Sequence, residues 1–382
     1  MKTIQTVARY FPEVCGGIQI RLSELLPALQ EYGVESKIAA AQEKPQEDTY
    51  TYKGTEVYRY PAFPVPLPEP NHGEYPHGGF ERFARWLKQQ RAEIYHQHQW
   101  TPKCGLPHLR LAKELGMTTI MSIRLPESIC QRQTLMLQGK EACDGKIDIG
   151  RCSYCCSVPQ SLPPSVLQGL SHTPTPIGSL ARRANRVLNR TPAPIGRTAE
   201  AMLSPIYITT FVAARQQSLL EMAKYADRIV TLSQQLHDIL LSNGVPQEKL
   251  VICRTGVPDS FVEAAQELKP KKQRTNTLRV VFLGRWNQTK GVHILVDAMK
   301  SLPPEIPIEL TIHASAVDNE NYRQQVLRKI ESEPRIRVAQ RLMRDELPSV
   351  LTTYDVLALP AQWFDVRPMV VLEGQWFITT TN

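Results

Sequence analysis

Two cations follow a strongly apolar segment at a spacing that suits phosphate binding. Residues 282–291 read Phe-Leu-Gly-Arg-Trp-Asn-Gln-Thr-Lys-Gly, and the apolar run before them begins at Leu278. If this run is a buried strand, Arg285 lies in the loop after it and Lys290 at the start of a helix, where free amides favour anions. Arginine binds phosphate through two hydrogen bonds, and lysine supplies a compact charge. The segment predicts a diphosphate site; the alternative is an exposed Arg and Lys beside a turn.

Two acidic residues occupy a second segment of the same kind. Residues 360–373 read Pro-Ala-Gln-Trp-Phe-Asp-Val-Arg-Pro-Met-Val-Val-Leu-Glu. If Pro368 opens a helix, Glu373 lies inside it and Asp365 in the loop before it. Carboxylates at such a position accept hydrogen bonds from sugar hydroxyls. The alternative is a capping Asp and an exposed helical Glu.

Five of the eight cysteines lie between Cys130 and Cys156. Cys130, Cys143, Cys152 and Cys155 end in a Cys-x2-Cys spacing, and four thiolates complete a tetrahedral zinc site. The spacing therefore predicts a structural zinc. Redox-labile thiols and plain reduced cysteines are the alternatives.

His96 and His98 follow a predicted strand at the point where parallel strands present their ligands. One interpretation places them in the cleft that receives an acceptor substrate. The other makes them satisfied core or surface histidines.

These residues need a scaffold, and the hydrophobic pattern predicts alternating strands and helices. Predicted strands cover 2–7, 34–40, 93–97, 119–123, 227–233, 250–254, 278–283, 308–313 and 356–359. Helices are predicted over 18–29, 106–115 and 291–302. Repeated β-α-β units favour parallel sheets with helices on both faces. The fold class is therefore α/β.

The composition suits a soluble protein of two domains. The chain has 382 residues, and 45 Lys plus Arg against 37 Asp plus Glu give a net charge of +8, which favours an anionic partner. No apolar run reaches the roughly 18–20 residues that span a bilayer. The first residues also lack the apolar core of a secretory signal. We expect a cytoplasmic protein.

The segment 157–198 interrupts the α/β pattern. It is rich in proline, and residues 149–199 contain no acidic residue. A short stretch carries four arginines, at positions Arg182, Arg183, Arg186 and Arg190. One interpretation is a solvated, mobile insertion. The other is a basic arm that binds an anionic membrane surface, where each cation contributes about 1 kcal/mol.

The two loop segments together resemble the donor half of the family-four retaining glycosyltransferases, which have the GT-B fold. The resemblance rests on Gly-Arg-x4-Lys-Gly at 284–291 and on the acidic segment at 360–373. Three further segments resemble the family in the same order along the chain, at 12–18, 226–233 and 255–258. A subset of the family also resembles the cysteine pattern of 129–155. The match covers residues 1–373, with the proline-rich segment as its main gap.

The resemblance implies roles for the residues that match. The catalytic residues would be Arg285, Lys290 and Asp365: the two cations would hold the donor diphosphate, and Asp365 would position the donor sugar. Glu373 would bind the ribose of the nucleotide. The family needs no cofactor or divalent metal for transfer.

The resemblance also implies the domain organisation. Residues 1–265 would form an N-terminal acceptor domain, 266–277 a linker and 278–382 the nucleotide-sugar donor domain, with two Rossmann-like parallel sheets facing a central cleft. In the first domain, Gly16 and Gly17 would let the backbone approach the diphosphate or the acceptor closely.

Four departures from the family pattern stand out. The first acid is usually Glu rather than Asp365, and Arg124 occupies a position that is often His. Ala314 stands where the family has a glycine. The family also continues well beyond Glu373, so we expect the donor domain of this chain to be incomplete.

The function implied is transfer of a sugar from a nucleotide diphosphate sugar, with retention, to a glycan or lipid-linked acceptor in cell-surface polysaccharide synthesis. The partners would be the donor, the acceptor and an anionic membrane at the inner face. The alternative is a truncated, non-catalytic remnant that binds nucleotide without transfer. Nucleic-acid binding is disfavoured because no strand pair interleaves aromatic and basic residues.

Overall fold

The computed structural model describes residues 1–13, 16–64, 75–190, 193–268, 276–363, 365–366 and 368–377. It divides into two compact units, Met1–Arg254 and Thr255–Asn382. Helix α9 (Asp259–Glu267) falls in the second unit, whereas the sequence analysis assigned most of its residues to the first domain. Most of the predicted linker 266–277 lies outside the described residues.

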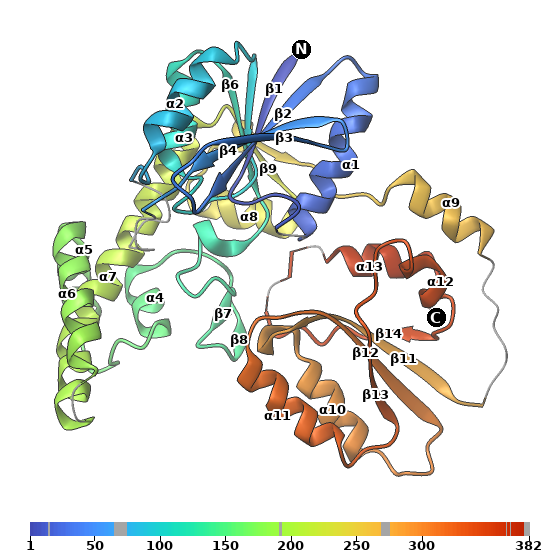
Figure 1. The fold of residues 1–382 in the computed structure, drawn as a ribbon. Coiled ribbons are helices and arrows are strands. Elements are labelled where there is room, and N and C mark those ends of the chain that lie inside the picture. Colours follow the sequence, from blue (N-terminus) through green and yellow to red (C-terminus); the bar gives the residue numbers. More distant parts are fainter. Residues whose placement is uncertain are drawn as a thin grey trace. The chain divides into compact units, whose positions relative to one another are not determined.

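The first unit is built on an eight-stranded sheet (Figure 1). Its strands are β1 (Lys2–Val7), β2 (Glu35–Gln42), β3 (Asp48–Tyr52), β4 (Thr55–Pro61), β5 (Ile94–Gln97), β6 (Thr118–Ile123), β9 (Arg228–Thr231) and β10 (Leu250–Ile252). They lie in the order β10-β9-β6-β5-β1-β2-β4-β3. Every neighbouring pair is parallel except β3 and β4, which form an antiparallel pair at one edge. The predicted parallel sheet is confirmed.

The chain reverses its direction across this sheet between β1 and β5. From β1 it passes through α1 (Gly17–Glu31) to β2, and from β5 it passes through α3 (Leu106–Glu114) to β6 on the opposite side. Since such crossovers are right-handed, α1 and α3 cover opposite faces. The other helices that connect strands of this sheet are α2 (Phe80–Gln89), η1 (Pro126–Ser128), α8 (Gln234–Ser242) and η2 (Gln247–Lys249). The crevice beside the carboxyl ends of β1 and β5 is where open α/β sheets bind ligands.

The segment between β6 and β9 is mainly helical. It contains the hairpin β7 (Met136–Leu137) and β8 (Glu141–Ala142), then α4 (Ile149–Cys155), α5 (Pro164–Ser171), α6 (Thr175–Leu188) and α7 (Ala193–Tyr225). Gly178 lets α6 pack closely against α7, because a Cβ at this position would lie 2.9 Å from the Thr210 Cγ2 on α7. The described part of the predicted mobile insertion is thus a packed helical bundle (Figure 1). No helix in the described part of the chain has the length and hydrophobicity to cross a bilayer.

The second unit contains a four-stranded parallel sheet in the order β13-β12-β11-β14. Its strands are β11 (Leu278–Trp286), β12 (Ile308–Val317), β13 (Ile336–Ala339) and β14 (Val356–Leu357). Besides α9, its helices are η3 (Gln288–Lys290), α10 (Val292–Ser301), α11 (Glu320–Ile330), α12 (Leu347–Leu351) and α13 (Met369–Gly374).

Both faces of the β11 strand are buried, as its apolar sequence predicts. Val280 and Phe282 pack on one face in a cluster with residues of α10 and α11. Val281 and Leu283 pack on the other face with residues of α9 and α12. Because side chains alternate along a strand, this continuous apolar run fills two cores at once. The strand therefore holds Arg285, near its carboxyl end, in a fixed position.

A hydrogen-bonded carboxylate ties β6 to β9 in the first unit. Asp227 accepts hydrogen bonds from the Thr119 backbone N at 2.8 Å and the Thr119 Oγ1 at 3.0 Å, and it pairs with Lys113. Burial alone would raise the pKa of Asp227, but the hydrogen bonds from Lys113 and Thr119 outweigh it and lower the pKa below the ordinary 3.8. The charged carboxylate therefore stabilises the fold above that pH, and this stabilisation disappears as the carboxylate is protonated.

We expect Asp227→Asn to lower the Tm at neutral pH by about 2 °C or more. Asparagine keeps the acceptor oxygen but removes the charge, so the difference from the unchanged protein should vanish as the pH falls below 3.8. Thermal unfolding followed by circular dichroism over this pH range measures the effect. Asp345→Asn, at an exposed position, is the control. An effect of equal size at acidic and neutral pH would contradict the electrostatic cause.

Candidate functional site

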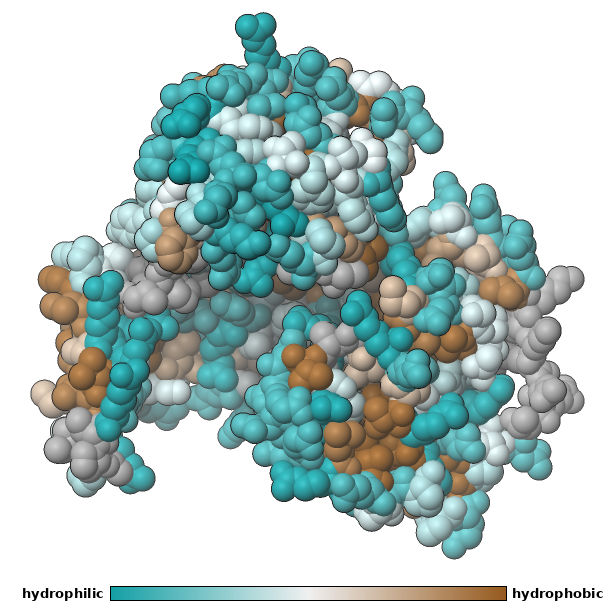
Figure 2. Space-filling model, viewed as in Figure 1, coloured by the Kyte–Doolittle hydropathy of each residue, from teal (hydrophilic) through white to brown (hydrophobic). Residues whose placement is uncertain are grey.

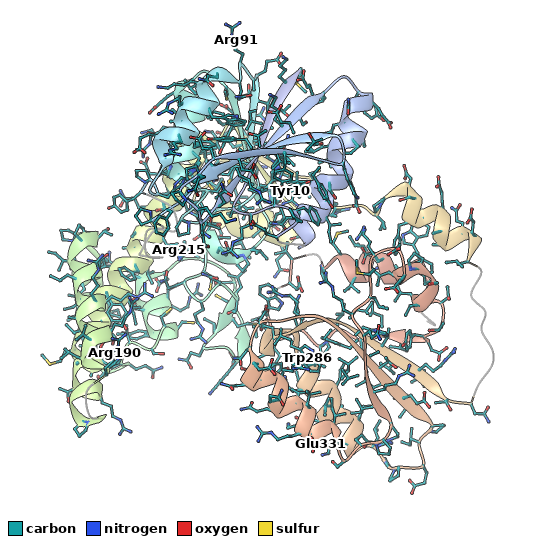
Figure 3. The ribbon with its side chains drawn as sticks, viewed as in Figure 1. Tyr10, Arg91, Arg190, Arg215, Trp286 and Glu331 are labelled. Carbon is teal, nitrogen blue, oxygen red and sulfur yellow. The ribbon has the colours of Figure 1, made fainter. Side chains whose placement is uncertain are left out.

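The end of the β11 strand, rather than the loop predicted after it, places the first predicted cation at the carboxyl edge of the second sheet, because β11 extends to Trp286. Arg285 is 57% exposed and forms an ion pair with Asp318, which follows the neighbouring strand β12. The Asn287 amide also donates to Asp318 at 3.0 Å. Trp286, at the end of β11, is buried and anchors the loop (Figure 3). Asp318 therefore holds Arg285 at the strand end, and the sequence analysis missed this partner.

The turn that carries Lys290 packs closely against the second predicted segment. The Asn287 side chain caps this turn by accepting from the Thr289 backbone N at 2.9 Å. The Gln362 backbone N donates to the Thr289 carbonyl at 2.7 Å. Gly291 has a φ of +74°, and a Cβ there would lie 1.8 Å from the Pro360 carbonyl oxygen. Only glycine suits both the left-handed conformation and this close approach.

This packing brings Lys290 and Asp365 together although they are far apart in sequence. The Lys290 Nζ forms an ion pair with the Asp365 carboxylate, and both side chains are largely buried. The same ammonium lies 5.0 Å from the centre of the Trp363 ring, within the range of a cation–π interaction. The Trp363 Nε1 is buried and has no hydrogen-bond partner among the described residues. A cation, a carboxylate and an indole donor thus meet at one point.

The second predicted acid is held elsewhere in the same unit. Glu373 lies on α13, which begins after Pro368 as predicted, and its side chain is only 4% exposed. Its Oε1 accepts a hydrogen bond from the Arg344 Nη1 at 2.8 Å. The structure therefore pairs Glu373 with Arg344. The sequence offered no signal for this pair, because Arg344 lies in a loop without a recognisable motif.

The two glycines predicted to approach a ligand lie at the start of α1 in the first unit. Gly16 is the N-cap of this helix, and a Cβ there would lie 2.8 Å from the Gln19 Oε1. Nothing lies within 4 Å of a Cβ built on Gly17. Within the described residues the local structure does not require glycine at position 17, so its open space is available to a ligand.

The structure does not support the predicted zinc site at Cys130, Cys143, Cys152 and Cys155. Together with Cys156, these cysteines line a common pocket with a cavity volume of about 30 Å³. In the described part of the chain, however, no group of three or more His, Cys, Asp or Glu side chains is placed to hold a metal ion.

The environment of these thiols explains the difference. Burial raises the pKa of Cys152 to about 11 and that of Cys156 to about 12, so without a metal both are neutral thiols at physiological pH. The Cys143 sulfur accepts from the Gly145 backbone N at 3.4 Å, and the Cys155 sulfur from the Gln138 backbone N at 3.2 Å. The Cys-x2-Cys spacing predicts that the cysteines are near one another, but it does not determine whether their sulfur atoms point toward a common centre.

The two histidines predicted to follow a strand are both hydrogen-bonded; His98 is buried and His96 is half-buried. His96 faces the Ser122 Oγ at 2.8 Å, and His98 faces the Gln5 Oε1 at 2.7 Å. Burial lowers the pKa of His96 to about 3, helped by the charge of Arg124, and lowers the pKa of His98 as well. Both rings are therefore neutral at physiological pH. His98 also lines a pocket, whereas His96 is a half-buried histidine whose ring is paired with Ser122.

Family models match each half of the chain. The model described as "Glycosyl transferase 4-like domain" matches residues 16–147, and the model described as "Glycosyl transferases group 1" matches residues 264–378. No curated protein matches the chain. The second match contains both loop segments of the candidate donor site.

Solved structures share the fold at low identity. HepE from Anabaena, solved with UDP and glucose, is 12% identical with a TM-score of 0.53, and the alignment covers 98% of this chain and 78% of HepE. A glycosyltransferase from Rickettsia africae is 13% identical with a TM-score of 0.55, covering 98% and 77%. The UDP-forming α,α-trehalose-phosphate synthase from Burkholderia vietnamiensis is 11% identical with a TM-score of 0.57, covering 99% and 80%. The chain therefore belongs to the GT4-like glycosyltransferases and has their α/β GT-B fold.

Proposed function

We propose that this glycosyltransferase moves a sugar from a nucleotide diphosphate sugar, with retention at the anomeric carbon, to a glycan or lipid-linked acceptor of cell-surface polysaccharide synthesis. The observation that carries the proposal is the meeting of Lys290, Asp365 and Trp363 in the unit whose strand β11 also carries Arg285. That HepE was solved with UDP and glucose supports a nucleotide-sugar donor.

Each residue of the donor loops has a role in this proposal. Arg285 and Lys290 bind the diphosphate and stabilise its charge as the sugar leaves, which is electrostatic catalysis. Asp365, already held by Lys290, accepts hydrogen bonds from the sugar hydroxyls. Glu373 binds the ribose of the nucleotide, and Arg344 orients its carboxylate.

The first unit supplies the acceptor side. Gly16 and Gly17 leave room for a ligand beside the first turn of α1. Retention requires the acceptor hydroxyl to reach the anomeric carbon on the face from which the diphosphate departs. The hydroxyl proton then passes to the departing phosphate, so transfer itself needs no cofactor.

A nucleotide-binding experiment tests the donor site. We expect one of UDP, GDP and ADP, at about 100 times its Kd, to raise the Tm by about 5 °C. Arg285→Ala should abolish most of this shift, because it removes a bidentate phosphate ligand. Arg323→Ala, an exposed arginine of α11, is the matched control. The absence of a shift with all three nucleotides would contradict the proposal. The configuration of the product, read from its anomeric NMR signals, tests retention.

We further propose that α6 docks on an anionic membrane at the cytoplasmic face. The exposed apolar side chains of this helix form a row at Ile177, Leu180 and Val187, which are 52%, 66% and 64% exposed. Exposed arginines form a second row at helical spacing beside them, at Arg183, Arg186 and Arg190. Figure 2 shows hydrophobic residues over the outer side of α5 and α6, next to hydrophilic ones. This arrangement is typical of helices that lie in a membrane interface.

Arg182 differs from the other arginines of the segment. Its guanidinium lies 5.6 Å from the centre of the Phe211 ring on α7. It therefore packs inside the bundle, and only three of the four predicted arginines belong to the docking surface.

Charge reversal tests the docking surface. The variant Arg183→Glu/Arg186→Glu/Arg190→Glu should weaken binding to phosphatidylglycerol vesicles by about 100-fold or more, since each cation contributes about 1 kcal/mol. Flotation of the protein with vesicles measures the binding, with phosphatidylcholine vesicles as the uncharged reference. Arg328→Glu/Lys329→Glu on α11 is the control. Equal binding by both variants would place the membrane contact elsewhere or exclude it.

A further inference from the structure

A pocket opens in the first unit at the carboxyl edge of β1, β5 and β6. It is small, with a cavity volume of about 20 Å³, so it suits one small polar group rather than a whole ligand. The lining includes Ile18, His98, Trp100, Ser122, Arg124 and Glu127. Since the strand order reverses between β1 and β5, this is the position at which open α/β sheets bind ligands.

A chain of hydrogen bonds fixes the Arg124 guanidinium at this pocket. Arg124 Nη2 donates to His98 Nδ1 at 3.2 Å, and His98 Nε2 donates to Gln5 Oε1 at 2.7 Å. The Gln5 Nε2 in turn donates to the Thr3 Oγ1 at 3.0 Å. Neutral His98 thus carries its proton on Nε2 and accepts with Nδ1. The imidazole orients Arg124 without neutralising it.

The positive charge of Arg124 lacks a counterion in the described part of the chain. Burial, together with the nearby charge of Arg21, lowers the pKa of Arg124 to about 10. No carboxylate of the described residues forms an ion pair with Arg124, and its Nε is buried without a hydrogen-bond partner. Glu127 lines the same pocket. Burial raises the pKa of Glu127, and the charged residue that opposes this rise is Arg215 on α7 (Figure 3), not Arg124. A partly buried cation without a counterion is costly, so an anion at this site would stabilise it.

We propose that Arg124 binds an oxyanion, a phosphate or carboxylate group, carried by the acceptor substrate. The identification of the ligand as the acceptor rests on the proposed function. It narrows the acceptor substrates of that function to molecules with an acidic group. A guanidinium matches either oxyanion through two parallel hydrogen bonds. The donor has its own cations, Arg285 and Lys290, in the other unit. The family pattern often has histidine at this position, so Arg124 would distinguish the acceptor of this enzyme.

Thermal shifts of the full chain with three probes test the site. Inorganic phosphate and glucuronate represent the two oxyanions, and glucose is the uncharged control. We expect at least one oxyanion, but not glucose, to raise the Tm by about 2 °C or more. Arg124→Met should lose this rise, and Arg285→Ala should keep it. Whichever oxyanion stabilises the chain identifies the acidic group.

A second readout separates binding from a structural role. If Arg124 is an unneutralised cation awaiting a ligand, Arg124→Met should have a Tm without ligand equal to or above that of the unchanged protein. A lower Tm for Arg124→Met, or an unchanged oxyanion shift, would overturn the inference, as would no shift with either oxyanion. Nucleotide binding by Arg124→Met should persist. If the unchanged protein shows the oxyanion shift but binds none of UDP, GDP and ADP, the proposed function is contradicted and the oxyanion site is not.

Discussion

Replacement of Lys290 by methionine is expected to lower the affinity for the nucleoside diphosphate about 10- to 100-fold, because it removes one charged hydrogen bond to phosphate. The rate of transfer should fall further, by about 100- to 1000-fold, since charge on the diphosphate develops as the sugar leaves. Methionine keeps the length of the side chain and its contact with the Trp363 ring. Isothermal titration calorimetry and release of the nucleoside diphosphate measure the two effects.

A matched lysine elsewhere in the same unit provides the control. The Lys329 Nζ lies 2.7 Å from the Asp297 Oδ1 on the surface of α10 and α11, so it also pairs with an aspartate. Lys329→Met should therefore leave both nucleotide affinity and transfer unchanged. If Lys290→Met kept more than a tenth of the transfer rate, or if both variants lost activity equally, the assignment of Lys290 to the diphosphate would be wrong.

The substitution Gly291→Ala is expected to lower the free energy of unfolding by about 3 kcal/mol or more. A left-handed residue other than glycine costs about 1–2 kcal/mol by itself. The added Cβ would also lie 1.8 Å from the Pro360 carbonyl oxygen, so the two loops would have to separate. Urea unfolding followed by the fluorescence of buried Trp286 measures the loss. Nucleotide binding should be lost as well, because the separation parts Lys290 from Asp365.

Gly33→Ala isolates the contribution of the contact with Pro360. Gly33 has the same φ of +74°, and nothing lies within 4 Å of its added Cβ. This variant should therefore show only the conformational cost, about 1–2 kcal/mol by circular dichroism. Equal losses for the two variants would mean that the donor loops adjust at little cost, and nucleotide binding by Gly291→Ala would then survive.

The order of strands and helices was predictable from the sequence because local patterns determine it. The apolar run of β11 and the spacing of α1 predicted their elements, and both sheets are parallel as expected. The motifs around Arg285 and Asp365 also indicated the family, since their residue types and spacing are local properties. The segment 157–198, which contains α5 and α6, was expected to be either a mobile insertion or a basic arm, and the long helix α7 was not predicted. Its stability comes from packing against α6, as at Gly178, which no local pattern reveals.

The tertiary structure decided which residues of the site meet. Lys290 and Asp365 form an ion pair only because Gly291 packs on Pro360. The partners Asp318 and Arg344 belong to segments that carry no motif, so only the folded chain identifies them.

In the first unit, the surroundings of the cysteines and of Arg124 could not be predicted from the sequence either. The Cys-x2-Cys spacing predicted zinc, but the structure gives the thiols separate hydrogen bonds and buried surroundings. Arg124 had no partner that the sequence suggested, and the fold places its charge beside neutral His98 without a counterion in the described residues. Sequence patterns determine which local segments form helices and strands. The ion pairs and the burial of side chains depend on segments that meet only after folding. The sequence therefore determined the fold class and the family, and the tertiary structure determined the chemical state and partners of the site.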